Sequence, residues 1–308
     1  MKTTLLFLCV FLSASLFGQY TQIPDADFEQ WLFDYGHDNV IDGQVLTNNI
    51  NWIEELTMLP GQLAYEISDL TGIEDFVSLK SLAIPDNNLT SIDVSQNTAL
   101  ESLNCGGNQL TSLDVSQNTA LTYLNCAQNQ ITSLDLTSNT ALTTLVCSLN
   151  PMTSLDLSTN SALEVFWCNG MVNPATFEYT LLSLDLSGAY ALWWVNISGN
   201  PLLNCVNIAN GNNNNFIDFN SYDCPNLFCI EVDDSDSPFI MGWDIDLHTS
   251  FSEDCNNDCT ANITELTTSK NLIQILDLMG RETSFKPNIP LIYVYDDGSI
   301  EKVFSVEY

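Results

Sequence analysis

The chain has 308 residues, 45% of them hydrophobic, and a formal net charge of -33 at pH 7. No Lys or Arg occurs from Ser81 to Ser269. Because phosphate binding requires clustered Lys and Arg, this composition excludes nucleic acid and disfavours anionic lipid surfaces. It leaves a neutral glycan, a cationic partner or divalent cations as ligands, although solubility alone also explains an acidic surface.

Residues 1–18 have the pattern of a secretory signal peptide. Lys2 precedes an apolar run from Leu5 to Leu16, and the small residue Gly18 marks the expected cleavage site. The run is too short for a stable transmembrane helix, and no later segment has about 18 uninterrupted apolar residues. We therefore expect an exported chain with no transmembrane segment after cleavage.

Residues 19–78 are predicted to form an N-terminal cap and a first atypical repeat. Pro24, Asp25 and Asp27 suit the first turn of a helix. The spacing i, i+3, i+4, i+7 then predicts one apolar helix face, formed by Phe28, Trp31, Leu32 and Tyr35. A helical cap would cover the apolar end of the array that follows.

Residues 79–204 repeat with a period of 21. Three sets of positions show the period: Leu100, Leu121, Leu142 and Leu163; Leu103, Leu124, Leu145 and Phe166; and Cys105, Cys126, Cys147 and Cys168. Leu155 and Leu184 are 29 residues apart instead, which indicates an insertion at about 169–179. A fixed period in this range predicts a stacked solenoid, whose extended surface favours binding over catalysis.

Each repeat consists of two similar halves, for example LESLNCGGNQ followed by LTSLDVSQNTA. We expect one short parallel strand per half, on two faces of the solenoid, with the central Leu pointing inward and its neighbours outward. An Asn ends each half, and we expect these side chains to satisfy backbone groups of the turns. The four repeated cysteines occupy inward positions, and their parallel directions favour free thiols over disulfides.

The outward residues of the first halves vary from turn to turn, which makes them candidate ligand contacts. An apolar strip is predicted from Tyr123, Val146, Val165, Trp167 and Trp194. Trp167 and Trp194 should lie diagonally on adjacent turns. Exposed aromatic strips bind peptides, proteins or sugar rings. Alternatively, the insertion folds over the tryptophans and buries them.

The second halves present a nearly constant outward Ser and Asp. Calcium at Asp114, Asp135 and Asp156 is one interpretation, and hydrogen bonding of each Asp to its own turn is the other. No cofactor is otherwise predicted. The chain has no H-E-x-x-H, no G-x-S-x-G and no glycine-rich phosphate loop, so we expect no catalytic residues and no enzyme.

The pattern L-x-x-L-x-C-x-x-N-x-L resembles the leucine-rich repeat, in the short variety frequent in exported proteins of Bacteroidota. The resemblance implies a strand-dominated solenoid with a binding role. It also implies a Cys-rich C-terminal cap, over residues 205–259, in which Cys229 and Cys255 form a disulfide. Five cysteines lie in this region, an odd number, so at least one remains unpaired or pairs elsewhere.

Residues 260–269 are predicted to be a linker, and residues 270–308 a small β-module with a hairpin. This tail resembles the C-terminal sorting domain of type IX secretion, and the matching positions include Asp277, Gly280, Arg281, Tyr293, Asp297 and Gly298. The resemblance implies the type IX machinery as a partner, transport across the outer membrane, and a secreted or cell-surface location. A further pair of cap strands is the alternative.

Together these patterns predict an exported, non-enzymatic binding or adhesion protein that recognises a protein or a glycan through its repeat surface. Two alternatives remain. One is a carboxylate-dependent hydrolase or accessory domain that uses the acidic residues. The other is a calcium-dependent structural protein of a surface layer.

Overall fold

A computed structural model describes residues 19–58, 66–173, 176, 178–255, 272–276, 291–295 and 300–303. The predicted signal peptide, the linker and five tail positions lie outside these residues, the five being Asp277, Gly280, Arg281, Asp297 and Gly298. The chain divides into two compact units, Met1–Thr260 and Ala261–Tyr308.

The first unit begins with a small α/β cap. Strand β1 (Tyr20–Gln22) pairs antiparallel with β2 (Gln44–Leu46), and the helices are α1 (Ala26–Asp34) and α2 (Thr47–Ile50). Asp25 starts α1, because its carboxylate accepts hydrogen bonds from the amides of Asp27 and Phe28 at 3.0 and 2.9 Å. Of the predicted apolar face, Phe28, Trp31 and Leu32 are buried, whereas Tyr35 follows the last helical residue and is 51% exposed.

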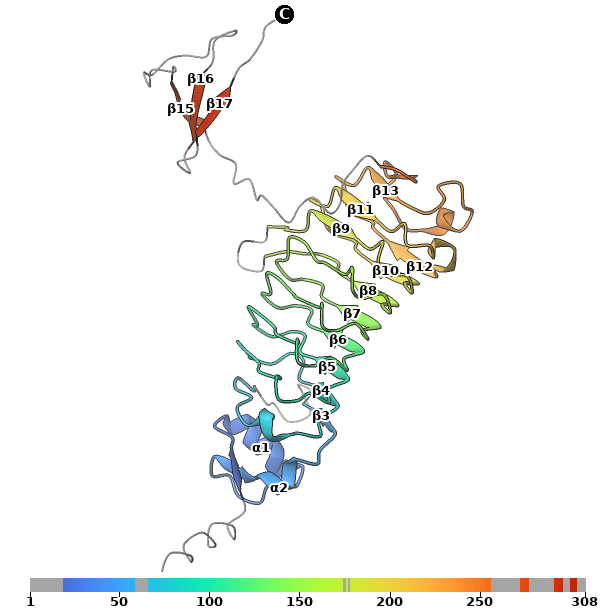
Figure 1. The fold of residues 1–308 in the computed structure, drawn as a ribbon. Coiled ribbons are helices and arrows are strands. Elements are labelled where there is room, and N and C mark those ends of the chain that lie inside the picture. The colour runs from blue at the N-terminus through green and yellow to red at the C-terminus, as the bar shows by residue number, and fades with distance from the viewer. Residues whose placement is uncertain are drawn as a thin grey trace, which may run out of the picture. The chain divides into compact units, whose positions relative to one another are not determined.

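A parallel sheet of eight short strands, here called the long sheet, runs through the repeats (Figure 1). Its strands are β3 (Glu55–Thr57), β4 (Ser81–Ala83), β5 (Ser102–Asn104), β6 (Tyr123–Asn125), β7 (Thr144–Val146), β8 (Val165–Trp167), β10 (Trp194–Asn196) and β12 (Asp218–Asn220). Equivalent residues of successive repeats are paired, as Leu103 with Leu124. The strand register therefore equals the sequence period, and the predicted solenoid is confirmed.

A second parallel sheet of four strands, here called the short sheet, lies on the other face. Its strands are β9 (Ser183–Asp185), β11 (Cys205–Asn207), β13 (Cys229–Glu231) and β14 (Ser250–Ser252). Short 3-10 turns complete the unit, and they are η1 (Ile73–Asp75), η2 (Asn213–Asn215) and η3 (Ile240–Gly242). Strands thus occur on two faces, but the second face has them only from Ser183 onward.

The strand predicted in every second half is absent from the earlier repeats, at 91–93, 112–114, 133–135 and 154–156. There the outward Asp accepts a hydrogen bond from the amide two residues later, as Asp114 does from Ser116 at 2.9 Å. This bond closes a turn at the Asp. The prediction is wrong here, but the turn alone is not the reason, because Asp185 accepts the same bond from the amide of Ser187 at 3.0 Å and still lies in β9.

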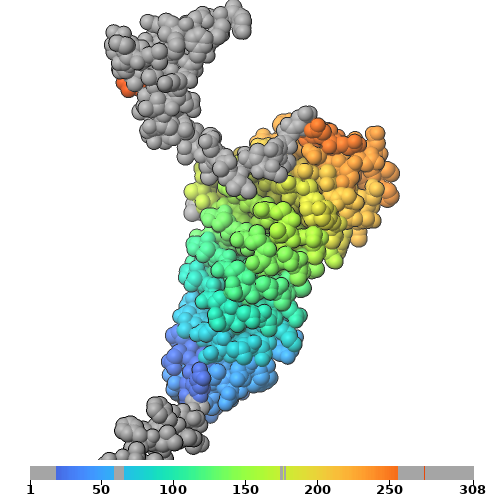
Figure 2. All heavy atoms as spheres, viewed as in Figure 1, coloured from blue at the N-terminus to red at the C-terminus, as the bar shows by residue number. Residues whose placement is uncertain are grey.

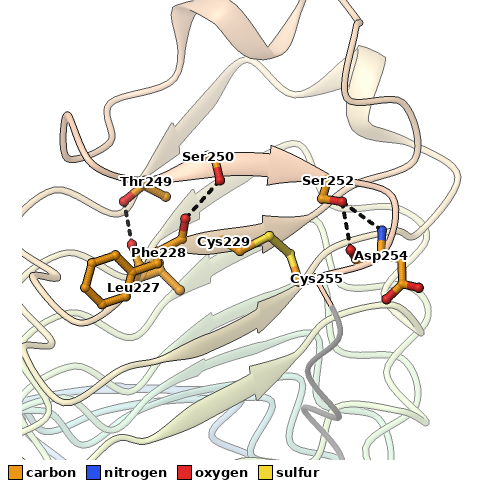
Figure 3. Close-up of a disulfide and its surroundings, with 8 residues drawn as sticks. All are labelled: Leu227, Phe228, Cys229, Thr249, Ser250, Ser252, Asp254 and Cys255. Atoms are coloured by element: carbon orange, nitrogen blue, oxygen red, sulfur yellow. Dashed lines mark hydrogen bonds between the residues drawn. A yellow bond between two sulfur atoms is a disulfide. The ribbon is translucent and has the colours of Figure 1, made fainter.

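Strands β11, β12, β13 and β14 carry the stacking on through residues 205–252, the region where the sequence predicts a Cys-rich cap. The predicted disulfide between Cys229 and Cys255 is confirmed, with 5.8 Å between the Cα atoms (Figure 3). It ties β13 to the segment that follows β14, the last strand of the short sheet. Thr249 and Ser250 add hydrogen bonds from their hydroxyls to the carbonyls of Leu227 and Phe228.

The core consists of the inward Leu and Cys residues. The four repeated thiols, of Cys105, Cys126, Cys147 and Cys168, are free and fully buried, as predicted. Burial raises the pKa of the Cys105 thiol to about 12. The Cys105 thiol therefore stays neutral. All four buried thiols act as small apolar side chains. Cys224 is also free and buried, whereas Cys205 is disulfide-bonded.

Two columns of buried asparagines satisfy the turns, as the sequence predicts. Asn129, in the first-half column, donates from Nδ2 to the carbonyls of Cys105 and Cys126 and accepts from the amide of Leu110. Asn118, in the second-half column, donates to the carbonyls of Val94 and Asn97. Each column joins a repeat only to its neighbours, and Figure 2 shows the repeats of this unit in sequence order.

The second unit contains an antiparallel sheet of three strands, β15 (Leu272–Leu276), β16 (Leu291–Tyr295) and β17 (Ile300–Val303). Tyr293 lies in β16 between Ile275 and Glu301, so the predicted hairpin is formed by β16 and β17. In the part of the chain that the structure describes, no helix is both long enough and apolar enough to span a bilayer.

Candidate functional site

The five predicted ligand contacts lie on four neighbouring strands of the long sheet. Tyr123 and Val165 belong to one outward row, which continues through Trp194. Val146 and Trp167 belong to the second outward row. All five side chains are partly exposed. The sequence pattern therefore identifies one continuous surface on β6, β7, β8 and β10.

Trp167 and Trp194 are in direct contact. The strand register places them diagonally, since Trp194 pairs with Val165 and Trp167 with Asn196. Their ring centroids are 5.2 Å apart and the rings meet edge to face at 73°. Nε1 of Trp167 is buried and has no hydrogen-bond acceptor among the described residues, so this indole is held by packing alone.

A third tryptophan belongs to the same cluster. The ring of Trp193 lies 5.8 Å from that of Trp194, at 35°. Its amide donates to the carbonyl of Glu164, and its own carbonyl accepts from the amide of Ile217, which is 80% exposed. Sequence reasoning missed Trp193 because it considered only the two residues that flank each inward side chain. The Trp-Trp doublet was the available signal.

The insertion leaves the indoles partly exposed. Its described residues close on themselves through a bridge between Val172 and Tyr179. They are also tied to the neighbouring turns, because the amide of Met171 donates to Asn200 and the hydroxyl of Thr180 to the carbonyl of Met152. Residues 174, 175 and 177 are not among the described residues. The three tryptophans keep partial exposure beside this loop.

The outward Asp residues of the second halves, Asp114, Asp135 and Asp156, are here called the acidic column. Each of them accepts hydrogen bonds from its own turn. One carboxylate oxygen of Asp135 accepts from the amide and the hydroxyl of Thr137, at 3.0 and 2.7 Å. Asp156 accepts from the amide of Ser158 at 2.9 Å. The hydrogen bonds from Ser116 hold the pKa of Asp114 below its usual value. Among the described residues, no three His, Cys, Asp or Glu side chains are grouped as a metal site would require.

The sequence also did not reveal a polar hollow of about 340 Å³ beside β5 and β6. It is lined by Pro85, Asp86, Asn104, Gly106, Gly107, Asn125, Ala127 and Gln128. Gly107 has a φ of +68°, and a Cβ there would overlap the Asp86 carboxylate. The Gly-Gly pair in this turn was the only signal in the sequence.

Comparison with known proteins supports the repeat assignment. A family model described as Leucine Rich repeats (2 copies) matches residues 98–138, so this segment carries leucine-rich repeats. No curated protein matches the sequence.

Three solved structures from Listeria monocytogenes are among those similar to this chain. The functional domain of InlJ, described as including a cysteine ladder, is 23% identical, with a TM-score of 0.49. That match covers 75% of this chain and 62% of that chain, so this chain spans less than two thirds of its length. The internalin inlF is 17% identical over 75% of this chain and 71% of its own, with a TM-score of 0.47. Internalin C2 is 14% identical, and the match covers 70% of this chain and 100% of that chain, with a TM-score of 0.44.

Proposed function

We propose that the protein is an exported, non-enzymatic binding or adhesion protein that recognises a protein or a glycan through the outward face of the long sheet. One observation carries the proposal. The inward and turn positions of the repeats are nearly constant, whereas the outward positions of β6, β7, β8 and β10 vary and bring Trp167 and Trp194 into contact. Variation on a constant scaffold is expected where a surface is adapted to a ligand.

Two sequence patterns support export. The first 18 residues have the features of a signal peptide, and the tail resembles a type IX sorting domain. The disulfide between Cys229 and Cys255 agrees with an oxidising compartment. We propose a secreted or cell-surface location, with the type IX machinery binding the tail. Mass spectrometry of the secreted protein tests this proposal, since a sorting tail predicts loss of the residues after Ser269.

No observation favours the alternatives that use the acidic column. A hydrolase or a calcium-dependent layer protein would need carboxylate oxygens that converge on a substrate or an ion. The acidic column instead has one Asp per repeat, at Asp114, Asp135 and Asp156. Each of these carboxylates already accepts a hydrogen bond from its own turn.

The test is binding to arrays of glycans and of extracellular proteins, with the wild type, Trp167→Ala and Trp194→Ala. Tyr190→Ala is the matched control, because Tyr190 is an exposed aromatic (62%) outside the strands of the long sheet. We expect both tryptophan variants to lose the wild-type ligand while the control keeps it. Unchanged binding in both tryptophan variants would refute the assigned face, and turnover of any ligand would refute the non-enzymatic assignment.

A further inference from the structure

Two exposed acidic residues border the tryptophan cluster. Glu164 lies beside Trp193 and Trp194, because its carbonyl accepts hydrogen bonds from both amides at 3.0 and 3.2 Å. Asp218 lies on the opposite side, paired with Trp194 across β10 and β12. Adjacent strands are about 4.8 Å apart. An exposed acidic residue therefore lies one strand away from Trp194 on each side.

Among the described residues, neither carboxylate forms an ion pair. The sequence contains no Lys or Arg from Ser81 to Ser269. Within the described residues the only ion pair joins Lys80 and Glu54 at 2.8 Å, and these residues directly precede β4 and β3, the first two strands of the long sheet. The cluster thus combines aromatic faces with negative charge that no described Lys or Arg pairs with, on a chain whose net charge is -33.

Such a combination distinguishes between classes of ligand. The face of an indole attracts a cation within about 6 Å of the ring centroid. The guanidinium of an arginine also stacks flat on the ring and donates paired hydrogen bonds to a carboxylate. The apolar stem of Arg or Lys can pack on exposed apolar groups, which Val165 and Ile217 supply here. A neutral sugar would use the rings but gain little from the two charges.

We propose that the ligand of this face is a cationic peptide segment, whose Arg or Lys side chains pack on Trp167, Trp193 and Trp194 and pair with Glu164 and Asp218. This inference rests on the proposed function, since it specifies the ligand of the same face. Charge complementarity is its main support, because a ligand with basic residues supplies the counter-charges that the repeats lack.

The experiment measures fluorescence anisotropy of a labelled, alternating arginine–glycine peptide with the full chain. A citrulline–glycine peptide of equal length removes only the charge, and a neutral β-glucan oligosaccharide represents the glycan class. The variants are Trp194→Ala, Glu164→Gln and Asp218→Asn. Asp114→Asn is the matched control, because it removes the same single charge while keeping the side-chain oxygen that accepts from Ser116.

We expect saturable binding of the arginine peptide that weakens with added salt. Trp194→Ala should weaken it about 5- to 30-fold. Glu164→Gln and Asp218→Asn should each weaken it about 2- to 5-fold, and Asp114→Asn should leave it nearly unchanged. The citrulline peptide and the oligosaccharide should bind much more weakly.

Three outcomes would overturn the proposal. Absence of arginine-peptide binding is the first. Equal weakening by Asp218→Asn and Asp114→Asn, with no effect of Trp194→Ala, is the second, because it indicates attraction to the acidic chain as a whole. The third is stronger, Trp194-dependent binding of the oligosaccharide. This third result refutes the cationic ligand but preserves the recognition face, so the two proposals fail separately.

Discussion

The two asparagine columns should contribute unequally to stability, and Asn129→Ala and Asn118→Ala measure the difference. Both side chains are buried and both variants remove the same atoms, so the cavity left behind is matched. Nδ2 of Asn129 donates to carbonyls of its own turn and of the preceding repeat, whereas Nδ2 of Asn118 donates to two carbonyls of the preceding repeat. Only Asn129 also accepts, from the amide of Leu110 at 2.9 Å. Oδ1 of Asn118 is buried with no donor among the described residues.

The magnitude follows from these contacts. Each side-chain amide has two N–H groups, although Asn129 shares them among three carbonyls, at Cys105, Cys126 and Ala127. Losing the bonds of these two N–H groups costs about 2 kcal/mol in either variant, at about 1 kcal/mol each. Asn129→Ala also leaves the Leu110 amide buried and unpaired, which costs about 1–3 kcal/mol more. Asn118→Ala instead removes an oxygen that is already unsatisfied, which lowers its cost. We therefore expect Asn129→Ala to cost about 2 kcal/mol more than Asn118→Ala.

The assay is urea unfolding of both variants, together with hydrogen exchange at the Leu110 amide. Exchange is needed because repeat arrays can unfold locally. We expect faster exchange of this amide in Asn129→Ala and near wild-type exchange in Asn118→Ala. Equal losses of stability, or protection of Leu110 in Asn129→Ala, would refute the reasoning.

Three further predictions concern other contacts. Replacing Cys229 and Cys255 by Ser opens a loop of 26 residues and should lower the unfolding free energy by about 3.5 kcal/mol, measured by denaturant unfolding; a loss below about 1 kcal/mol would contradict it. Asp25→Asn keeps the helix cap but loses the acceptor for the Ser68 and Asp69 amides, so it should destabilise the protein at neutral pH. Burial raises the pKa of Asp25, but the hydrogen bonds from Ser68, Phe28 and Asp69 together lower it more, so its folded-state pKa lies below the usual value. The stabilisation that this carboxylate provides above about pH 4 should therefore disappear as the pH falls, which denaturation measured across a pH series will test. Burial raises the pKa of Cys126 well above its usual value, so iodoacetamide at pH 8 should not label the repeated thiols until the protein unfolds, and rapid labelling of the native protein would argue against a buried ladder.

Much of the scaffold can be predicted from the sequence because one periodic pattern specifies it repeatedly. The inward Leu103 and Leu124 are paired and fully buried, as their spacing of 21 requires. The distribution of strands could not be predicted from that period. The period is the same for both halves of a repeat, whereas a strand also needs backbone pairing between successive turns. Asp185 lies in a paired strand and makes the same turn bond as Asp114, which lies in none, so the residue pattern does not separate the two cases.

The candidate surface was predictable in part for a similar reason. Alternation along a strand identifies Trp167 and Trp194 as outward residues, and the register then places them side by side. Alternation does not apply to Trp193, which precedes its strand and joins the cluster through the orientation of its ring. The hollow at Gly106 and Gly107 likewise depends on backbone conformation in a turn, which a side-chain pattern does not report.

The central claim is that the two faces of the repeats have different roles, recognition on the long sheet and support on the acidic column. One paired measurement tests it most directly: ligand affinity and urea midpoint for Trp194→Ala and for Asp135→Ala. Trp194→Ala should lose affinity with little change in midpoint. Asp135→Ala should lower the midpoint with unchanged affinity, because its carboxylate holds the turn at Thr137. Loss of affinity in Asp135→Ala together with full affinity in Trp194→Ala would contradict the account.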